Sequence, residues 1–237
     1  MMSNLKAVIL AGGLGARLRP FTEVIPKPLL PIGGKSILQI QIERLKNNGF
    51  KEIYICTNYK SNYIEDFIGD GSRYGVTITV SKENKPLGTA GPLTLLKKYL
   101  KEPFVVMNGD ILSSVNFENL YKFAVDKDSD ICLAIKKEIT PYEFGNILFD
   151  GDDVLEMQEK PDTVKYILAG IYVINPRILD KIPNNKYYGM DHLINQLIAN
   201  KMKVLKYEIS EYWLDIGRYD DYEKAEDDYK AHFSKAD

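Results

Sequence analysis

The sequence predicts an α/β fold built on a doubly wound, mixed β-sheet that carries a small second lobe. Two observations lead to this prediction. In the first half of the chain, short apolar runs alternate with amphipathic segments of helical period, as in parallel strands joined by crossover helices. In the second half, strand-like runs follow one another closely, which favours antiparallel pairing. In sheets of this kind, ligands bind beyond the carboxyl ends of the parallel strands.

The first half should contain four strands, at residues 7–10, 53–57, 76–80 and 104–107. Three helices are expected between them, at residues 36–48, 61–68 and 93–100. Gly49 and Gly69 follow the first two helices and should end them, and Ser61 should cap the second.

The second half should contain helices at residues 117–125 and 191–199 and strands at residues 131–135, 167–174, 204–208 and 212–214. Asp150-Gly151-Asp152-Asp153 separates two further strand-like runs, 146–149 and 154–158, and predicts a hairpin. Residues 219–233 are expected to form an acidic amphipathic helix. Because no linker, repeat or low-complexity segment interrupts the pattern, residues 1–237 are expected to form a single domain.

Composition excludes some classes of partner. The net charge is −2, from 31 basic and 33 acidic side chains, which argues against binding nucleic acid through bulk charge. No apolar run approaches the roughly 18 residues of a membrane span, so no membrane partner is expected. A strand begins almost at the first residue and leaves no room for a signal peptide, so we expect a cytoplasmic protein. Cys56 and Cys132 lie in apolar runs and should be buried free thiols.

The segment that follows the first strand carries the strongest functional signal. It reads LAGGLGARLRPFTEVIPKP, from Leu10 to Pro28. Glycines let a backbone approach a bulky anion and turn its N–H groups toward it, while cations such as Arg17 and Lys27 add the charge that a phosphate chain needs. We therefore expect a nucleoside triphosphate site at the carboxyl end of the first strand.

Three other interpretations of this segment compete. A dinucleotide-binding fingerprint would need a third spaced glycine where Arg17 stands, and an acidic residue where the second strand ends at Thr57-Asn58. A P-loop would need Gly-Lys-Ser/Thr after the glycines. A plain glycine-rich turn does not explain Lys27, because the prolines on both sides of it restrict the backbone, a costly arrangement for a merely exposed lysine.

The stretch LAGGLGARLRPFTEVIPKPLLPIGGKSIL resembles the signature of sugar-1-phosphate nucleotidyltransferases, the NDP-sugar pyrophosphorylases, and the resemblance continues through KENKPLGTAGPL, MNGD, EKP and YWLDIG. These enzymes join a sugar 1-phosphate to a nucleoside triphosphate and release pyrophosphate. The resemblance implies the Rossmann-like nucleotide-diphospho-sugar transferase fold. Residues 1–135 would mainly bind nucleotide, 136–218 would mainly bind sugar, and 219–237 would form a C-terminal helix.

The same resemblance assigns roles to individual residues. Arg17 would bind the β- and γ-phosphates, Lys27 the reacting phosphates and Lys160 the sugar phosphate, as the catalytic cations. The sugar would be held by Gly145, Glu159, Lys160, Ala169 and Gly170. The nucleotide would be held by Leu10, Ala11, Gly12, Gly13, Gly15, Glu83, Pro86, Gly88, Thr89, Asn108 and Gly109.

Two aspartates are the candidate metal ligands. Asp110 follows a buried strand, and Asp215 lies in the apolar segment WLDIG, where a carboxylate is costly unless it is paired or bound to a metal. The family pairs two such aspartates on Mg²⁺, an ion that combines carboxylates with substrate phosphates. The alternative for Asp215 is a cap on the helix after Gly217.

The loop of residues 86–92 resembles that of guanylyltransferases of the GDP-mannose, GDP-heptose and GDP-glucosamine type. Glu83 lies five residues before Gly88, and its carboxylate could accept from both donors on the edge of guanine. We therefore favour GTP. A solvated Glu83 is the plain alternative, and uridylyl-, thymidylyl- and cytidylyltransferases are the related ones. Mannose-type enzymes usually carry Asn-Ala-Gly where this chain has Leu168-Ala169-Gly170, which disfavours mannose 1-phosphate and leaves the sugar open.

The expected reaction is in-line attack of the sugar phosphate on the α-phosphorus. A phosphate monoester has its second pKa near ~6, so the attacking dianion needs no general base, and neither His192 nor His232 is placed in the mechanism. A regulatory paralogue that binds nucleotide sugars without turnover remains an alternative, as does an enzyme acting on a non-sugar phosphate. Small relatives are often homodimers, but the sequence reveals no interface.

Overall fold

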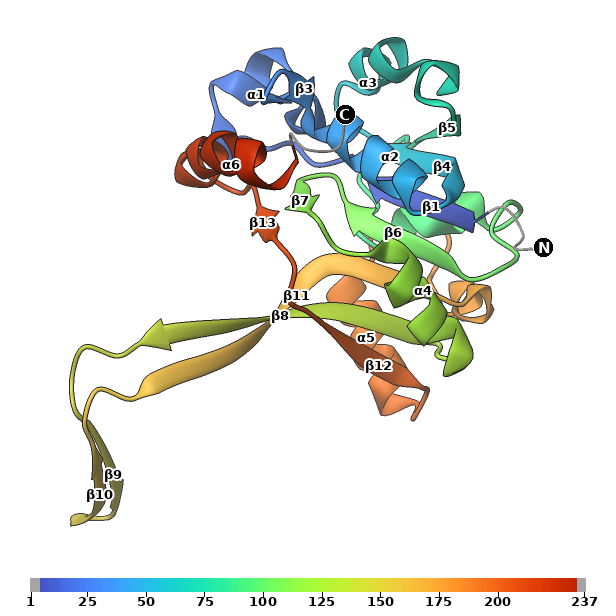
Figure 1. Cartoon of the computed structure of the whole chain (residues 1–237). Helices are drawn as coiled ribbons and strands as arrows, with labels where there is room; N and C mark the ends of the chain where they lie inside the picture. Colours follow the sequence, from blue (N-terminus) through green and yellow to red (C-terminus); the bar gives the residue numbers. More distant parts are fainter. Residues whose placement is uncertain (1–4, 234–237) are drawn as a thin grey trace.

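The structure, a computed structural model, describes residues 5–233. Its centre is a seven-stranded sheet in the order β12-β8-β11-β6-β1-β4-β5 (Figure 1). Four parallel strands form one side of this sheet: β6 (Phe104–Asn108), β1 (Leu5–Leu10), β4 (Phe50–Thr57) and β5 (Thr77–Lys82). The chain leaves β1 toward β4 and later returns to its other side as β6, so the strand order reverses between β1 and β6. Ligands of open α/β sheets bind at such a point.

The other side of the sheet is mixed, as predicted. It contains β8 (Ile131–Pro141), β11 (Asp162–Ile174) and β12 (Val204–Ile209). β11 runs antiparallel to both β6 and β8, whereas β12 runs parallel to β8. The β11 register shifts between Leu168 and Tyr172, and Gly170 lies in this bulge with φ of 67°.

Helices cover both faces of the sheet, which confirms the doubly wound arrangement. One face packs against α2 (Ile37–Asn47), α3 (Ser61–Ile68) and α4 (Phe117–Asp126). The opposite face packs against α5 (Met190–Ala199) and the 3₁₀ helices η4 (Gly91–Leu96) and η5 (Pro176–Lys181). Cys56 and Cys132 are buried free thiols in these two layers. None of the helices within residues 5–233 has the length and apolar character to span a bilayer.

A third apolar cluster packs the last helix of the structure against an early segment of the chain. In it α6 (Tyr219–His232) packs against the small sheet of β2 (Pro31–Ile32) and β3 (Lys35–Ser36) and against η1 (Ala16–Leu18). Between η1 and β2 lie α1 (Phe21–Val24) and η2 (Lys27–Leu29), and η3 (Ser72–Tyr74) precedes β5. The C-terminal helix therefore supports the segment that the sequence identified as a phosphate loop.

Two local predictions were wrong. Residues 93–100 were expected to form an α-helix, but a short 3₁₀ helix begins at Gly91-Pro92 and ends at Leu96. Ser61 was expected to cap α3, but the preceding Lys60 takes the cap position with φ of 50°. The Ser61 hydroxyl instead lies 2.8 Å from the Thr57 hydroxyl at the end of β4.

The second lobe expected from the sequence takes the form of an arm. β8 and β11 continue past the sheet as a two-stranded ribbon, and β9 (Asn146–Asp150) and β10 (Asp153–Gln158) form the predicted hairpin at its end (Figure 1). Seven consecutive residue pairs, from Leu168 with Ile135 to Asp162 with Pro141, hold the ribbon straight. We call residues 136–168 the arm.

Candidate active site

A cavity of about 560 Å³ opens at the carboxyl ends of β1 and β6, where the strand order reverses. Nine of the residues predicted to bind nucleotide line it: Leu10, Gly12, Gly13, Gly15, Glu83, Pro86, Gly88, Thr89 and Asn108. Asp110 also lines it. Six further lining residues were missed by sequence reasoning: Leu14, Ala16, Asn58, Leu87, Pro92 and Tyr187. We call this space the nucleotide cavity.

Gly15 makes the turn of the glycine loop. Its φ is +61°, and a Cβ there would lie 2.8 Å from the Thr22 methyl group and 3.2 Å from the Lys27 Cβ. The Thr22 hydroxyl donates to the Gly15 carbonyl at 2.9 Å and fixes the turn. Gly13 differs, because a Cβ there would meet nothing within 4 Å. Its open surroundings fit a backbone that a ligand can approach.

The floor of the nucleotide cavity is formed by the ends of two neighbouring parallel strands, β1 and β6. The Gly109 N–H donates to the Leu10 carbonyl at 2.9 Å, and a Cβ on Gly109 would lie only 2.8 Å from that oxygen. Ala11 is buried beside them, so Ala11 and Gly109 shape the floor without lining the cavity. Only glycine allows β6 to approach β1 this closely at Gly109.

Gln41 is a positioning residue that sequence reasoning missed. It is buried on α2, and its amide donates to the carbonyl of Asn108 at 3.0 Å and to that of Ile111 at 2.8 Å. These two bonds clamp the turn that carries Asp110. The available signal was a glutamine within a helix whose neighbours Leu38, Ile42 and Leu45 were expected to be buried.

Glu83 faces the nucleotide cavity. One of its oxygens accepts from the Leu87 N–H at 2.9 Å, and the other would lie 2.9 Å from a Cβ on Gly12. Burial raises the pKa of the Glu83 carboxyl, and the bond from Leu87 opposes this rise. The solvated alternative therefore does not describe this half-buried side chain.

Thr89 has a second contact besides the cavity. Its hydroxyl accepts from the Met190 N–H at 2.7 Å, at the start of α5. The loop before it packs against Tyr188, whose N–H donates to the Leu87 carbonyl at 2.9 Å. A Cβ on Gly88 would lie 2.6 Å from the Tyr188 carbonyl oxygen. This side of the cavity is thus held by the segment that leads into α5.

Lys27, Asp110 and Asp215 form the charged centre of the site. The Lys27 ammonium lies 2.6 Å from Asp110 Oδ2, and its side chain is only 10% exposed. Asp215 reaches the same place because β13 (Trp213–Asp215) pairs with β7 (Ile111–Ser113), and the Ile216 N–H donates to the Asp110 carbonyl at 3.0 Å. Asp215 is exposed on the second-cavity side, but partial desolvation still raises its pKa. The Asp110 charge raises the pKa further, while Lys27 and Arg17 oppose the rise.

Asp215 does not cap the following helix, so that alternative was wrong. Arg218 is the first flanking residue of α6, and the Asp221 carboxylate accepts from the N–H groups of Arg218 at 2.7 Å and Gly217 at 3.1 Å. Asp221 therefore satisfies the helix start and leaves the Asp215 carboxylate to the charged centre.

Arg17 lines a second cavity of about 500 Å³, not the nucleotide cavity. Asp215 and Trp213 also line this space, together with Lys136 from the root of the arm. A Cβ on Gly217 would lie 3.3 Å from the Arg17 guanidinium. Because Asp110 borders the nucleotide cavity and Asp215 the second one, the two cavities meet at the charged centre.

The structure divides the residues predicted to bind the sugar into two groups. Ala169 is buried in β11 next to the root of the arm, where its carbonyl accepts from the Trp213 indole at 2.7 Å. Gly170 lies against Asn108, whose amide nitrogen would be 2.7 Å from an added Cβ. Gly145, Glu159 and Lys160 instead lie together on the exposed outer part of the arm, near the hairpin.

The distance between these groups follows from strand geometry. Leu168 and Asp162 are six steps apart on one continuous ladder, and at ~3.3 Å per residue this separates them by roughly 20 Å. Glu159 and Lys160 lie beyond Asp162, toward the β9–β10 hairpin, so within one chain they are far from the charged centre.

The charged centre has the donors that Mg²⁺ prefers. Asp110 and Asp215 offer hard carboxylate oxygens, and within residues 5–233 no group of three or more His, Cys, Asp and Glu side chains is placed to hold a metal. Mg²⁺ commonly takes one or two carboxylates and completes its shell with water and substrate phosphates, so these two residues fit it.

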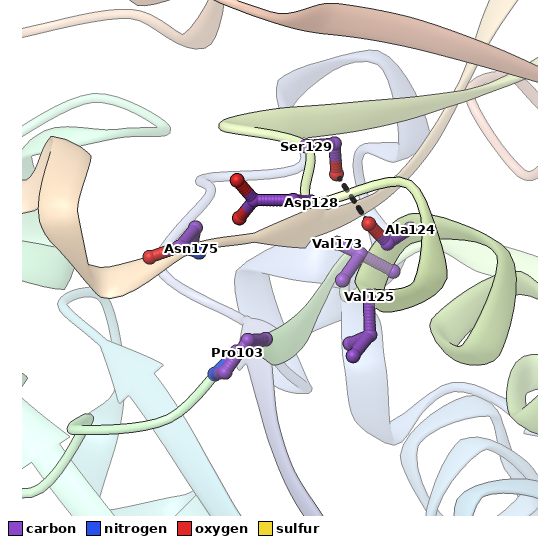
Figure 2. Close-up of a pocket in the computed structure, with 7 residues that line it drawn as sticks. All are labelled: Pro103, Ala124, Val125, Asp128, Ser129, Val173 and Asn175. Atoms are coloured by element: carbon purple, nitrogen blue, oxygen red, sulfur yellow. Dashed lines mark hydrogen bonds between the residues drawn. The ribbon is translucent and has the colours of Figure 1, made fainter.

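A third, smaller cavity of about 60 Å³ lies at the opposite end of β6, near Pro103 and the end of α4 (Figure 2). Its lining includes Asp128 and Asn175, and the Ser129 hydroxyl donates to the Ala124 carbonyl at 3.1 Å. It has room for a few water molecules and no lining cation. The two cavities that meet at the charged centre are the candidate site.

Comparison with known proteins identifies the family of this chain. The family model described as nucleotidyl transferase matches residues 6–232. The chain belongs to the nucleotidyl transferase family. It is 34% identical over 229 residues to the mannose-1-phosphate guanyltransferase of Pichia angusta, and 32% identical over 226 residues to the mannose-1-phosphate guanylyltransferase catalytic subunit beta of Danio rerio. Each match covers 92% of this chain and 62% of the relative, so the chain spans less than two thirds of their length.

Several solved structures share the fold of this chain. HddC from Yersinia pseudotuberculosis is 28% identical, with a TM-score of 0.75 over 95% of this chain and 99% of HddC. HddC has also been solved in complex with GMP-PN. A UDP-glucose pyrophosphorylase complexed with UDP-glucose shares the fold at 20% identity, with a TM-score of 0.72 over 97% of this chain and 99% of that one.

Proposed function

We propose that this chain transfers a nucleotidyl group from a nucleoside triphosphate, GTP by preference, to a sugar 1-phosphate and releases pyrophosphate. The observation that carries the proposal is the meeting of two cavities at Lys27, Asp110 and Asp215. One cavity has the glycine loop suited to a nucleotide, and the other has cations suited to a second phosphate. A reaction between two polyanions needs such an arrangement.

Positioning and charge account for the proposed chemistry. The sugar phosphate attacks the α-phosphorus in line, and pyrophosphate leaves on the opposite side. Lys27 and Arg17 stabilise the charge that develops on the phosphate oxygens. Asp110 and Asp215 would hold Mg²⁺, which when bound neutralises phosphate charge and orients the triphosphate. Because the phosphate monoester is already a dianion at neutral pH, no side chain has to remove a proton.

The preference for GTP rests on Glu83 and on the relatives. A carboxylate has about four lone-pair positions, so the bond from Leu87 leaves capacity for the two adjacent donors of guanine. The matched relatives named above are guanylyltransferases, and HddC binds a guanine nucleotide analogue. Uracil and thymine offer one ring N–H beside a carbonyl, and a carboxylate would repel the carbonyl oxygen.

The decisive experiment is a matrix of nucleoside triphosphates against sugar 1-phosphates, with pyrophosphate release as the readout. We expect turnover with GTP and at least one sugar 1-phosphate, and a kcat/KM for GTP at least tenfold above those for UTP, dTTP and CTP. Mannose 1-phosphate is the first sugar to test because of the relatives' names, although Leu168 replaces the asparagine of mannose-type enzymes. No turnover with any pair would overturn the proposal.

A substitution of Glu83 tests the choice of base. Glu83→Gln should lower kcat/KM for GTP by roughly 10- to 100-fold relative to UTP, because the amide can accept only one of the two guanine donors. Glu65→Gln is the matched control, since Glu65 lies outside the cavity and pairs with Lys82 at 2.5 Å. An unchanged ratio of GTP to UTP would refute the role of Glu83.

A further inference from the structure

The arm gathers most of the exposed large apolar side chains of the molecule. Of the 23 such side chains found among residues 5–233, 12 lie between residues 139 and 168. Phe144, Phe149 and Leu155 are each 69 to 70% exposed. At roughly 100 Å² each, these side chains offer on the order of 1,000 Å² of apolar surface, above the 300–600 Å² of the largest patch on a typical monomer and close to one side of a stable interface.

The arm also lacks the support that a ribbon needs. Beyond the Lys136–Ile209 pair, β12 no longer borders β8, so a two-stranded ribbon continues with both faces uncovered. Isolated two-stranded ribbons are marginal in water unless they pack against something. The continuous ladder from Leu168 to Asp162 holds this ribbon away from the body of its own chain (Figure 1).

The second cavity lacks two charged residues, Glu159 and Lys160, that the arm carries far from it. The second cavity contains Arg17, Lys136 and Trp213, but Glu159 and Lys160 lie roughly 20 Å or more out along the arm. The cavity lies at the root of the arm, since Lys136 and Ile167 belong to its first pairs. A neighbouring copy can supply the missing groups by packing its arm along this root.

We propose that two copies of this chain exchange arms, so that Glu159 and Lys160 of each copy complete the sugar side of the other copy's site. A second copy is the occupant because the groups absent from the site are present in the chain itself. A two-fold interface is self-complementary, so each arm covers the apolar patch that the other exposes.

Charge supports the same pairing. Residues 142–163 contain seven acidic side chains and one basic one. The second cavity is lined by three carboxylates and four cations, the cations being Arg17, Lys136, Lys137 and Lys224. An acidic arm tip is therefore attracted to the rim of this cavity, and two acidic tips repel each other and do not pair tip to tip.

Complementation between two inactive variants tests the exchange, and this test rests on the proposed function. One variant, Lys27→Met/Asp110→Asn, disables the charged centre and keeps the arm. The other, Glu159→Ala/Lys160→Ala, disables the arm at exposed positions and keeps the charged centre. The two chains are co-expressed with different affinity tags, and the heterodimer is isolated through both tags.

Exchanged arms give the heterodimer one intact site of two, so we expect about half the activity of the wild-type dimer. If each arm serves its own chain, the heterodimer has no intact site and stays as inactive as either variant, which overturns the proposal. An arm variant with wild-type activity also overturns it. Wild-type chain without turnover instead refutes the proposed function, and the mass measurement below still tests the arm.

The molar mass in solution gives a readout that does not depend on turnover. Light scattering should find two 27.0 kDa chains per particle for the wild type, and a single chain for Phe149→Ser/Leu155→Ser. The control Ile198→Ser changes an apolar side chain of α5 that is 55% exposed and should leave the dimer intact. A monomeric wild type at micromolar concentrations, or a dimer that survives the arm substitutions, contradicts the exchange.

Discussion

Substitutions of the Lys27–Asp110 ion pair should affect stability and activity differently. Lys27→Met keeps the length and apolar contacts of the stem and removes only the ammonium. The pair has an N–O distance of 2.6 Å, with side chains 10% and 28% exposed. After the substitution, the carboxylates of Asp110 and Asp215 remain side by side without their nearest cation.

The geometry sets the size of the effect. At 2.6 Å and an effective dielectric constant of ~20, the attraction is about 6 kcal/mol before desolvation. Desolvation of the two groups offsets more than half of it, and charged hydrogen bonds in proteins contribute a net of about 1.5–3 kcal/mol. We therefore expect Lys27→Met to lower the free energy of unfolding by about 2–3 kcal/mol.

Urea denaturation and pyrophosphate-release kinetics at pH 7.5 measure the two effects. The double variant Lys27→Met/Asp110→Asn should recover most of the stability, because the unpaired carboxylate is gone. Both variants should lose activity by a factor on the order of 10²–10³. The matched control is Lys122→Met on α4, whose pair with Glu118 also measures 2.6 Å but is 46% and 40% exposed and should cost less than about 0.5 kcal/mol.

Two results would refute this reasoning. Lys27→Met could cost no more stability than Lys122→Met, which would mean that burial does not strengthen the pair. Alternatively, Asp110→Asn could fail to recover the stability of Lys27→Met, which would place the cost in packing around the lysine stem and not in the unpaired carboxylate.

Three further substitutions have defined outcomes. Gly109→Ala brings a Cβ to 2.8 Å from the Leu10 carbonyl and should destabilise the fold by about 1–3 kcal/mol, seen as a lower Tm. Asp215→Asn should unfold at a higher urea concentration than the wild type at pH 7.5, while its turnover falls on the order of 10²-fold or more. The reason is that desolvation and the Asp110 charge raise the pKa of Asp215, so the folded state binds the proton more tightly than the unfolded state. The free energy of unfolding of the wild type therefore falls as the pH rises through the raised pKa. The stability advantage of Asp215→Asn should vanish as the pH drops toward 3.8. Gln41→Leu leaves two carbonyls at the β6–β7 turn without donors and should cost about 2 kcal/mol, with a lower kcat.

Each of these substitutions has a control of the same chemistry. Gly13→Ala adds a Cβ that meets nothing within 4 Å and should leave the Tm unchanged. Asp227→Asn changes an exposed carboxylate of α6 and should leave the urea midpoint at pH 7.5 unchanged. Gln39→Leu removes a bond to Glu43 on the half-buried side of α2 and should cost less than about 0.5 kcal/mol. Equal effects in variant and control would contradict the corresponding prediction.

The sequence by itself determined the layered core and the nucleotide cavity. Residues 7–10 of β1 and 104–107 of β6 are continuous apolar runs because both faces of a parallel sheet are covered, and the strand ends place Gly12 and Asn108 at one edge. Gly15 and Gly88 occupy left-handed backbone positions that only glycine adopts readily, so the residue type alone marked these turns. Signals of this kind are local, and local periodicity or backbone sterics suffice to detect them.

Tertiary structure alone decided which distant groups meet. Asp110 and Asp215 are neighbours because two three-residue strands, β7 and β13, pair across more than 100 residues, and strands that short have no detectable period of their own. Arg17, predicted to bind the triphosphate, lies beside Gly217 on the second cavity, because η1 packs in the same apolar cluster as α6. Glu159 was expected to hold the sugar and Lys160 its phosphate, and the continuous β8–β11 ladder holds both residues away from the charged centre. Pairing register and packing between remote segments depend on contact energies summed over the whole fold, and no single segment of the chain contains them.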